Sequence, residues 1–207
     1  MSLDGYVAGP DQDEENPLGR GGLQLHEWVF PLREFRETHG EVGGETNASS
    51  AVVEERRENV GATIMGRNMF GPVRGEWPDV SWRGWWGEDP PYHHPVFVLT
   101  HHPREALVMQ GGTTFHFVTD GIESTLGQAQ DAAEGQDISL AGGASVVNQY
   151  LAACLVDEID VSIVPVVLGG GERLFEGLQR DALKLQQVRS IEAPGVTHIK
   201  YVPAGRR

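Results

Sequence analysis

The sequence predicts an α/β fold with three layers, α/β/α, built around a mostly parallel sheet. Short apolar runs alternate with helical patterns between residues 60 and 155, which is typical of parallel strands joined by crossover helices. Two alternating runs within residues 182–202, joined by the turn Ala-Pro-Gly, predict an antiparallel hairpin at one edge of that sheet. A length of 207 residues suits a single domain over residues 1–207.

The first sixty residues are expected to hold the end of a strand and two helices. Residues 1–8 have the pattern of a strand end followed by a turn. Apolar residues recur at helical spacing over residues 25–40 and predict the first helix. A second helix is expected over residues 51–59, with Ser49 or Ser50 as its N-terminal cap.

A long loop is expected over residues 71–95, after a short buried strand at 63–65. The loop holds glycines, prolines and four tryptophans with no regular period, and that many tryptophans argue against disorder. The indoles have two equally supported roles. They close over a planar substrate by stacking, or they are buried in a dimer interface.

The second half of the chain completes the alternation of strands and helices. Strands are expected at 95–100, 113–119, 137–143 and 157–169, and helices at 122–135 and 144–155. Cys154 is the single cysteine, so no disulfide forms within the chain, and its apolar helical surroundings predict a buried, inert thiol.

The composition excludes several classes of partner. The formal net charge is −14 and the pI is about 4.9, so neither nucleic acid nor an acidic membrane surface is an expected partner. No apolar run is long enough to span a membrane, and the chain opens without a signal-peptide pattern. These features predict a cytoplasmic protein.

The expected carboxyl ends of the parallel strands carry the chemistry. Ligands of such sheets bind at this edge. Gly142-Gly143 stands where a strand enters a helix, followed by the small residues Ala144 and Ser145. The two glycines either give the turn its backbone freedom or let an anion approach the unpaired N–H groups of the helix. The pattern alone supports both interpretations.

Basic residues follow the expected strands at 63–65 and 95–100. Arg67 follows Gly66, and Thr100, His101 and Arg104 follow the next strand, so that they are candidates for one local basic cluster. A guanidinium in such a cluster is able to grip the 2′-phosphate of an adenosine. The histidine pairs lack neighbouring Cys, Asp or Glu at ligand spacing, so no metal site is predicted.

Five motifs in a fixed order carry a family resemblance over nearly the whole chain. They are MSLDGYVAG, TIMGRNMF, PVFVLT, SLAGGASVVNQYL and VDEIDVSIVPVVLGGGERLF. With them the chain resembles the dihydrofolate reductase superfamily, and most closely the reductase domain of the riboflavin-pathway deaminase–reductase and its stand-alone relatives. The resemblance implies the three-layer α/β/α fold and NADPH as the cofactor.

The resemblance also implies which residues bind that cofactor. It implies that the turns after two strands bind the adenosine phosphate end. The double-glycine turn would bind the pyrophosphate, and the first strand would line the nicotinamide pocket. The implied residues, in that order, are Gly66, Arg67, Leu99, Thr100, His101 and Arg104; Gly142, Gly143, Ala144, Ser145 and Val146; and Ala8.

Hydride transfer also needs a proton for the substrate. Asp4 is the first candidate, because its motif is expected beside the nicotinamide, although an Asp before a Gly is equally typical of a turn. Glu27 is the second candidate. Arg33 stands where folate reductases carry the carboxylate that holds the pterin, which argues against folate as the substrate.

We therefore expect an NADPH-dependent reductase that transfers a hydride to a C=N or C=O of a small heterocyclic or carbonyl substrate. The first alternative is the riboflavin-pathway step itself, reduction of 5-amino-6-(5-phosphoribosylamino)uracil. The second alternative is a binding protein for a nucleotide or flavin without catalysis. Relatives of this kind commonly pair through their C-terminal strands, so a homodimer is expected.

Overall fold

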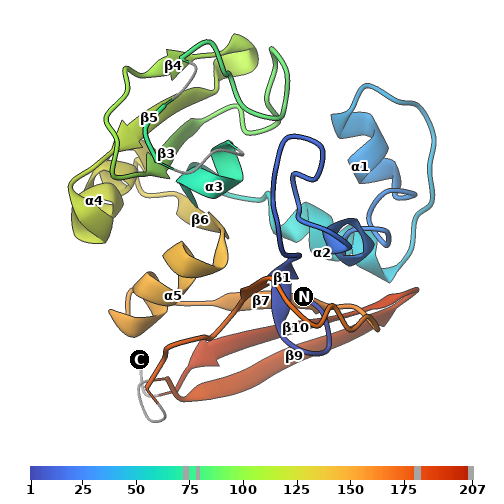
Figure 1. The fold of residues 1–207 in the computed structure, drawn as a ribbon. Coiled ribbons are helices and arrows are strands. Elements are labelled where there is room, and N and C mark those ends of the chain that lie inside the picture. Colours follow the sequence, from blue (N-terminus) through green and yellow to red (C-terminus); the bar gives the residue numbers. More distant parts are fainter. Residues whose placement is uncertain (72–74, 78–79, 180–182, 205–207) are drawn as a thin grey trace. The chain divides into compact units, whose positions relative to one another are not determined.

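The computed structural model describes residues 1–71, 75–77, 80–179 and 183–204 (Figure 1). The chain forms two compact units, one made of Met1–Glu58 with Asn148–Arg207 and the other of Asn59–Val147. The expectations for residues 72–74 and 78–79 of the tryptophan loop, and for residue 182 at the start of the hairpin, fall outside the described residues.

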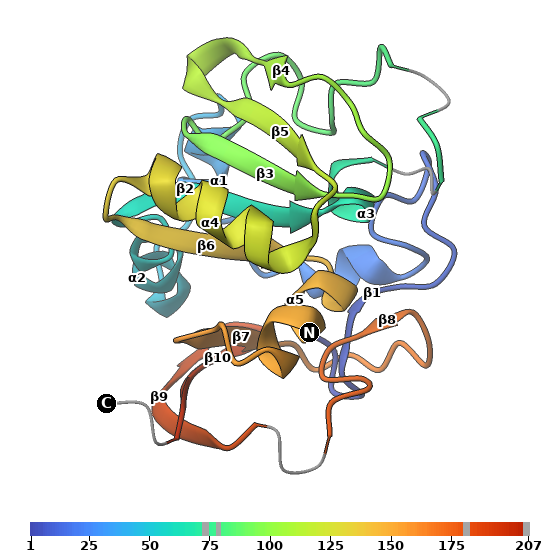
Figure 2. The same cartoon turned by 90° about the vertical axis from the view of Figure 1, so that its left-hand side faces the viewer.

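The unit Asn59–Val147 is built on a five-stranded sheet in the order β4-β5-β3-β2-β6. Four of its strands are parallel, and they end at the same edge of the sheet, where α3 begins in Figure 2. The short strand β4 pairs with β5 in the antiparallel direction. The strands are β2 (Val60–Gly66), β3 (Pro95–Leu99), β4 (Leu107–Val108), β5 (Thr114–Val118) and β6 (Asp137–Gly142). The mostly parallel sheet is therefore confirmed.

Helix α4 (Gly121–Ala133) covers one face of this sheet. It packs on β2 and β3 and buries Thr125, Ala129 and Ala133 completely. Small residues at these positions let the helix axis approach the sheet closely. The helix confirms the element expected over residues 122–135.

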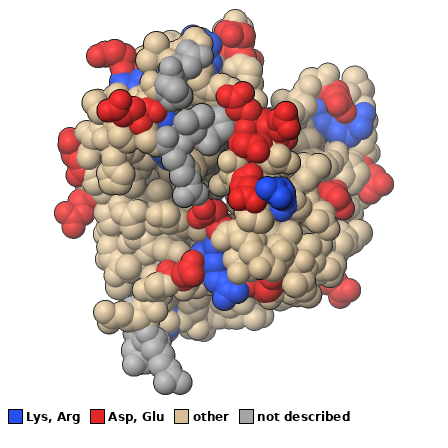
Figure 3. All heavy atoms as spheres, in the orientation of Figure 1, with Lys and Arg blue, Asp and Glu red and all other residues tan. Residues whose placement is uncertain are grey.

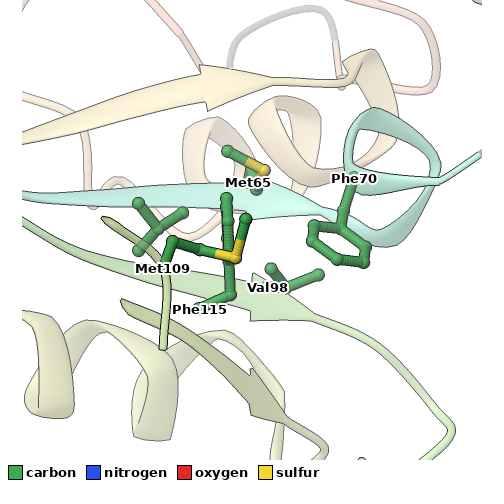
Figure 4. Close-up of a cluster of buried hydrophobic side chains, with 6 residues drawn as sticks. Met65, Phe70, Val98, Met109 and Phe115 are labelled. Atoms are coloured by element: carbon green, nitrogen blue, oxygen red, sulfur yellow. The ribbon is translucent and has the colours of Figure 1, made fainter. Parts of the chain in front are cut away.

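An apolar cluster covers the opposite face of the sheet, together with the short helix α3 (Arg67–Phe70). Figure 4 shows that its side chains come from α3, neighbouring strands and the segment after β4. Trp77, Trp82 and Trp86 are half-buried and pack against it. Trp86 stacks on Phe115 with 5.9 Å between ring centroids. The tryptophan loop thus contributes to the core of its own unit, a role different from the two that were predicted for its indoles. The cluster is Met65, Phe70, Val96, Val98, Met109 and Phe115.

The other unit holds a three-stranded antiparallel sheet in the order β7-β10-β9. Its strands are β7 (Ile159–Ile163), β9 (Leu185–Ala193) and β10 (Val196–Pro203), and β9 and β10 form the expected hairpin. The hairpin joins β7 in this separate sheet, so its expected place at the edge of the parallel sheet is wrong. The strand expected over residues 157–169 is present as β7 but is shorter, and its ladder ends before Pro165, which has no N–H to donate.

The first residues of the chain take over the pairing beyond β7. The backbone N–H of Leu3 donates to the carbonyl of Val166, and that of Val164 donates to Met1. Strand β1 (Tyr6–Ala8) then pairs with β8 (Glu172–Arg173). A strand within residues 1–8 is therefore present as β1, but it follows the turn at residues 3–5, whereas the sequence predicted the turn after the strand.

The two helices expected in the first sixty residues differ from the structure. In place of one helix over 25–40 there is a 3₁₀ turn, η1 (Gly22–Leu25), a run of turns and the short helix α1 (Arg33–Thr38). The helix α2 (Ala48–Glu55) is capped by Asn47, whose side chain accepts from the Ser49 N–H at 2.8 Å. A second short 3₁₀ element, η2 (Gln110–Gly112), follows β4.

Helix α5 (Ala144–Ala152) ends earlier than expected and leaves Cys154 outside it. Cys154 has a φ of 57°, and the N–H of Leu155 donates to the carbonyl of Tyr150, the pattern of a Schellman cap. Cys154 is exposed, so the prediction of a buried thiol is wrong. The apolar residues of the segment 144–155 did not reveal that the helix ends at Ala152.

Candidate nucleotide-binding site

The candidate site lies at the carboxyl edge of the parallel sheet in the unit Asn59–Val147. The chain adds β3 and β5 on one side of β2 and then crosses to place β6 on the other side. Ligands of open α/β sheets bind where the order of strands reverses in this way. Gly66 pairs in register with Leu99, and Met65 pairs with Gly142, so the three strand-end turns are neighbours.

The end of β2 packs directly against the first turn of α5. A Cβ atom at Gly66 would lie 2.8 Å from Cγ2 of Val146, which is closer than real Cβ contacts. Glycine at this position therefore allows the helix to begin beside the strand. Figure 1 shows α5 following β6 at this junction.

The two glycines of this turn have different roles. Gly142 has a φ of 129°, a conformation that side chains rarely adopt, and its peptide bond to Gly143 is cis. A Cβ atom at Gly143 would meet no described atom within 4 Å, so open space lies before it. The carbonyl of Gly143 accepts from Val146 and Val147 and opens the helix. The N–H groups of the first helical turn make such a terminus suited to an anion.

Arg67 is buried, with 9% of its surface exposed. Its guanidinium donates to the carbonyls of Gly75 and Glu76 and lies 3.4 Å from the ring centroid of Trp77. Within the described residues its Nε has no hydrogen-bond partner and it forms no ion pair with a carboxylate. Burial, together with the charge of Arg104, lowers the pKa of Arg67.

Arg104 approaches the same indole from the turn after β3. Its guanidinium carbon lies 4.9 Å from the ring centroid of Trp77 and 5.0 Å from that of Phe117. It donates to the carbonyls of Val80 and Trp82. The structure thus brings together the two arginines of the predicted basic cluster. Trp77 was missed as a site residue, since nothing in the sequence distinguishes it from the other tryptophans of its loop.

The remaining residues after β3 form a tight turn. Thr100 is buried, and its hydroxyl oxygen accepts from the backbone N–H of His102 at 3.1 Å. His101 is exposed, and Leu99 ends the strand half-buried. The threonine hydroxyl therefore holds the local backbone, while the imidazole of His101 is accessible to solvent.

Asp4, Ala8 and Glu27 belong to the other unit. The carboxylate of Asp4 accepts from the backbone N–H of Leu168 at 3.1 Å and from that of Gly169 at 2.7 Å. Hydrogen bonds, first from Ser2 and then from these backbone groups, lower the pKa of Asp4 to about 2. The carboxylate of Asp4 therefore holds a loop that is distant in the sequence, whereas a turn-forming aspartate bonds its own neighbouring backbone.

Ala8 ends β1 where backbone segments meet closely. A Cβ atom at Gly171 would lie 2.1 Å from the Ala8 carbonyl oxygen, and one at Gly9 would lie 2.1 Å from the carbonyl oxygen of Arg20. Ala8 itself is buried. Glu27 is exposed in the turns after η1.

Three general observations concern the surface, the metal-ligating side chains and the helices. Figure 3 shows acidic side chains spread over the visible face among fewer basic ones, in keeping with the net charge of −14. Across the described ranges, no three His, Cys, Asp or Glu side chains gather as a metal ion would require. None of the helices described for this chain is long and apolar enough to cross a membrane.

Comparison with known protein families identifies the family of this chain. The family model described as the RibD C-terminal domain matches residues 1–198. The chain belongs to the RibD C-terminal domain family. The resemblance inferred from the five motifs is thereby confirmed.

Two curated relatives of this RibD-domain chain are the uncharacterized proteins YyaP and YwjB of Bacillus subtilis (strain 168). YyaP is 33% identical over 119 residues, and the match covers 55% of this chain and 62% of YyaP. YwjB is 32% identical over 88 residues, and the match covers 42% of this chain and 49% of YwjB. The matched part thus spans less than two thirds of either relative.

Solved structures confirm the fold. A putative riboflavin biosynthesis protein from Shewanella sp. PV-4 superimposes with a TM-score of 0.63 at 24% identity, covering 100% of this chain and 96% of that one. A diaminohydroxyphosphoribosylaminopyrimidine deaminase/5-amino-6-(5-phosphoribosylamino)uracil reductase from Thermotoga maritima gives 0.54 at 14% identity, covering 99% of this chain and 54% of that one. At these identities the likeness concerns the fold, and the α/β class predicted from the sequence agrees with it.

Proposed function

We propose that this RibD-domain chain is an NADPH-dependent reductase that transfers a hydride to a C=N or C=O of a small heterocyclic or carbonyl substrate. Family membership supports a reductase. The observation that supports NADPH most directly is the buried Arg67, which shares an indole with Arg104 and forms no described ion pair. A buried cation without a carboxylate is costly unless an anion joins it.

The residues at the sheet edge fit the parts of this cofactor. The first turn of α5 and the open space before Gly143 suit the pyrophosphate, because the helix dipole favours an anion at this terminus. Arg67 and Arg104 suit the adenosine 2′-phosphate, which a guanidinium binds in bidentate fashion. NADPH when bound supplies the hydride, and the chain supplies orientation and the electrostatic surroundings.

The proton for the substrate is assigned by elimination between two carboxylates. A pKa of about 2 leaves Asp4 ionised at neutral pH, so it has no proton to give. We therefore propose that Asp4 positions the loop at Leu168 and Gly169. Glu27 is exposed to solvent, and we propose that a water molecule supplies the proton.

A riboflavin-pathway role is the alternative that family membership favours. The Thermotoga maritima protein of similar fold is named as a 5-amino-6-(5-phosphoribosylamino)uracil reductase. If this chain carries out the same reduction, the purified protein oxidises NADPH when that pyrimidine is added. Oxidation of NADPH with other heterocycles, and none with this one, would exclude the alternative and keep the broader proposal.

The first experiment is a titration of the purified protein with NADPH, and in parallel with NADH, followed by quenching of tryptophan fluorescence. We expect saturable binding of NADPH that Arg67→Ala weakens. Arg20→Ala serves as the matched control, because that exposed arginine pairs with Asp11 in the other unit. A folded protein that binds neither nucleotide would overturn the reductase proposal and favour a flavin-binding or other non-catalytic role.

A further inference from the structure

Trp77 touches both basic turns of the sheet edge. Arg67 follows β2 and stacks on the indole, with its guanidinium carbon 3.4 Å from the ring centroid. Arg104 follows β3, and its guanidinium carbon lies 4.9 Å from the same centroid. The indole Nε1 donates to the backbone carbonyl of His102 at 3.0 Å. One side chain therefore joins the ends of two neighbouring parallel strands.

This arrangement keeps two like charges close together. The chain has 30 Asp and Glu residues against 16 Lys and Arg residues, so carboxylates are plentiful. Arg67 nevertheless contacts backbone carbonyls and an aromatic ring, and it forms no ion pair within the described ranges. Cation–π contact offsets part of the cost of burying a guanidinium. A doubly charged anion that contacts both guanidinium groups would be attracted to each of them.

The other tryptophans of the loop lack this relation to the arginines. The indole of Trp82 donates to the carbonyl of Phe70, and the ring of Trp86 packs on Phe115 and Tyr92. Neither ring is in cation–π contact with Arg67 or Arg104 in the described part of the chain. Trp86 is therefore a matched control, since it is also half-buried against the apolar cluster.

We propose that Trp77 is a positioning residue that fixes Arg67 and Arg104 as a two-guanidinium clamp for a phosphate monoester on a nucleotide ribose. It acts through the arginines, and it thereby sets the preference for NADPH over NADH. The assignment rests on the proposed function for the identity of the nucleotide. The clamp itself rests on the stacking distances and on the bond to His102.

The experiment compares Trp77→Leu, Trp77→Phe and Trp86→Leu with the unchanged protein. Isothermal titration calorimetry gives the Kd of NADPH, NADH, adenosine 2′-monophosphate and adenosine 5′-monophosphate for each. We expect Trp77→Leu to weaken NADPH and adenosine 2′-monophosphate about 10-fold or more, the scale of one lost charge-assisted contact. The Kd of NADH and of the 5′-monophosphate should change by less than about 2-fold, since neither ligand reaches the clamp.

Trp77→Phe keeps an aromatic face and loses only the bond to His102, so it should retain most of the selectivity and remain folded. Trp86→Leu should leave the ratio of NADPH to NADH affinity unchanged. Equal weakening of both nucleotides by Trp77→Leu, or the same loss of selectivity in Trp86→Leu, would show that Trp77 only packs the core and would overturn the proposal.

The probes separate this inference from the proposed function. Binding of adenosine 2′-monophosphate without binding of either dinucleotide would overturn the reductase and support the clamp. Equal affinity of the unchanged protein for NADPH and NADH would overturn the clamp and leave a reductase. Absence of all binding in a folded protein would overturn both.

Discussion

The most buried arginine of the unit Asn59–Val147, Arg67, differs from the paired basic side chains of the other unit. In the unit Met1–Glu58 with Asn148–Arg207, cations face carboxylates: Arg189 and Lys200 each lie 2.6 Å from Glu55, and Arg56 pairs with Asp160. In the unit Asn59–Val147, Arg67 is buried against an indole and backbone carbonyls. An ion pair with a carboxylate neutralises the cation and links the elements that carry the two side chains. A buried cation that contacts only neutral groups remains able to bind an anionic ligand.

The network around His198 gives the largest predicted effect and belongs to the carboxylate-rich unit. His198 is 3% exposed, and its ring nitrogens lie 2.9 Å from Ser49 Oγ and 2.8 Å from Ser162 Oγ. Burial, and then the nearby charge of Arg56, lower the pKa of His198 from 6.5 to about 4. The unfolded chain therefore binds a proton more readily than the folded chain between these two pH values.

Stability should consequently fall as the pH drops from 6.5 towards 4, and be fully present above 6.5. The shift corresponds to a loss on the order of 3 kcal/mol. Urea unfolding at pH values from 4 to 7.5 measures it, with His198→Gln as the variant that lacks the titrating group. An equal pH slope in both proteins would assign the acid sensitivity to other groups, of which His26, His94 and His116 also have lowered pKa values.

Arg67→Gln gives the next largest effect, and it acts on binding more than on folding. Loss of the charge should weaken NADPH by about 2 kcal/mol, or roughly 30-fold, because a charge-assisted contact to phosphate is lost. The unfolding midpoint should change little, because the charge that is removed is itself unfavourable in its buried position. Calorimetric binding and thermal unfolding on the same preparation test both halves, with Arg20→Gln as the control. A large drop in stability with unchanged binding would give Arg67 a structural role like that of Arg56.

The sequence identified the parallel sheet and its edge because its strands are short runs rich in apolar and aromatic residues, bounded by turn residues. Residues 95–100 and 113–119 were predicted as strands, and the structure has them within one or two residues. The attachment of the hairpin could not be predicted, because the partner of β10 is set by long-range pairing with β7. Local patterns say which residues alternate, and they do not say which strand edge is available.

The same limit applies to the site. Gly142 and Gly143 stand out in the sequence because two glycines between a strand and a helix indicate either a tight turn or the close approach of an anion. Trp77 does not stand out, because its role depends on two arginines from different strands converging on one ring. The end of the helix before Cys154 was likewise hidden, since a left-handed cysteine leaves no mark in the pattern of apolar residues.

Glu55→Gln gives the smallest predicted effect, and it acts in a different pH range from His198. Hydrogen bonds, first from Arg189 and then from Lys200, lower the pKa of Glu55 from 4.5 to about 2. Its contribution is therefore present above pH 4.5 and is lost as the pH falls towards 2. Glu55 is about a third exposed, so solvent screens these pairs and the loss at neutral pH should be about 1 kcal/mol.

Urea unfolding of Glu55→Gln at pH 7 and pH 3 tests this, because the variant should be less stable than the unchanged protein at pH 7 and its deficit should be clearly smaller at the lower pH. Glu54→Gln is the matched control, since that exposed neighbour on α2 forms no ion pair in the described ranges. Added salt should shrink the difference at pH 7, because the pairs are partly exposed. If the deficit of Glu55→Gln persisted undiminished at pH 3, the carboxylate would act through packing, and the contrast between paired and unpaired cations would rest on Arg67 alone.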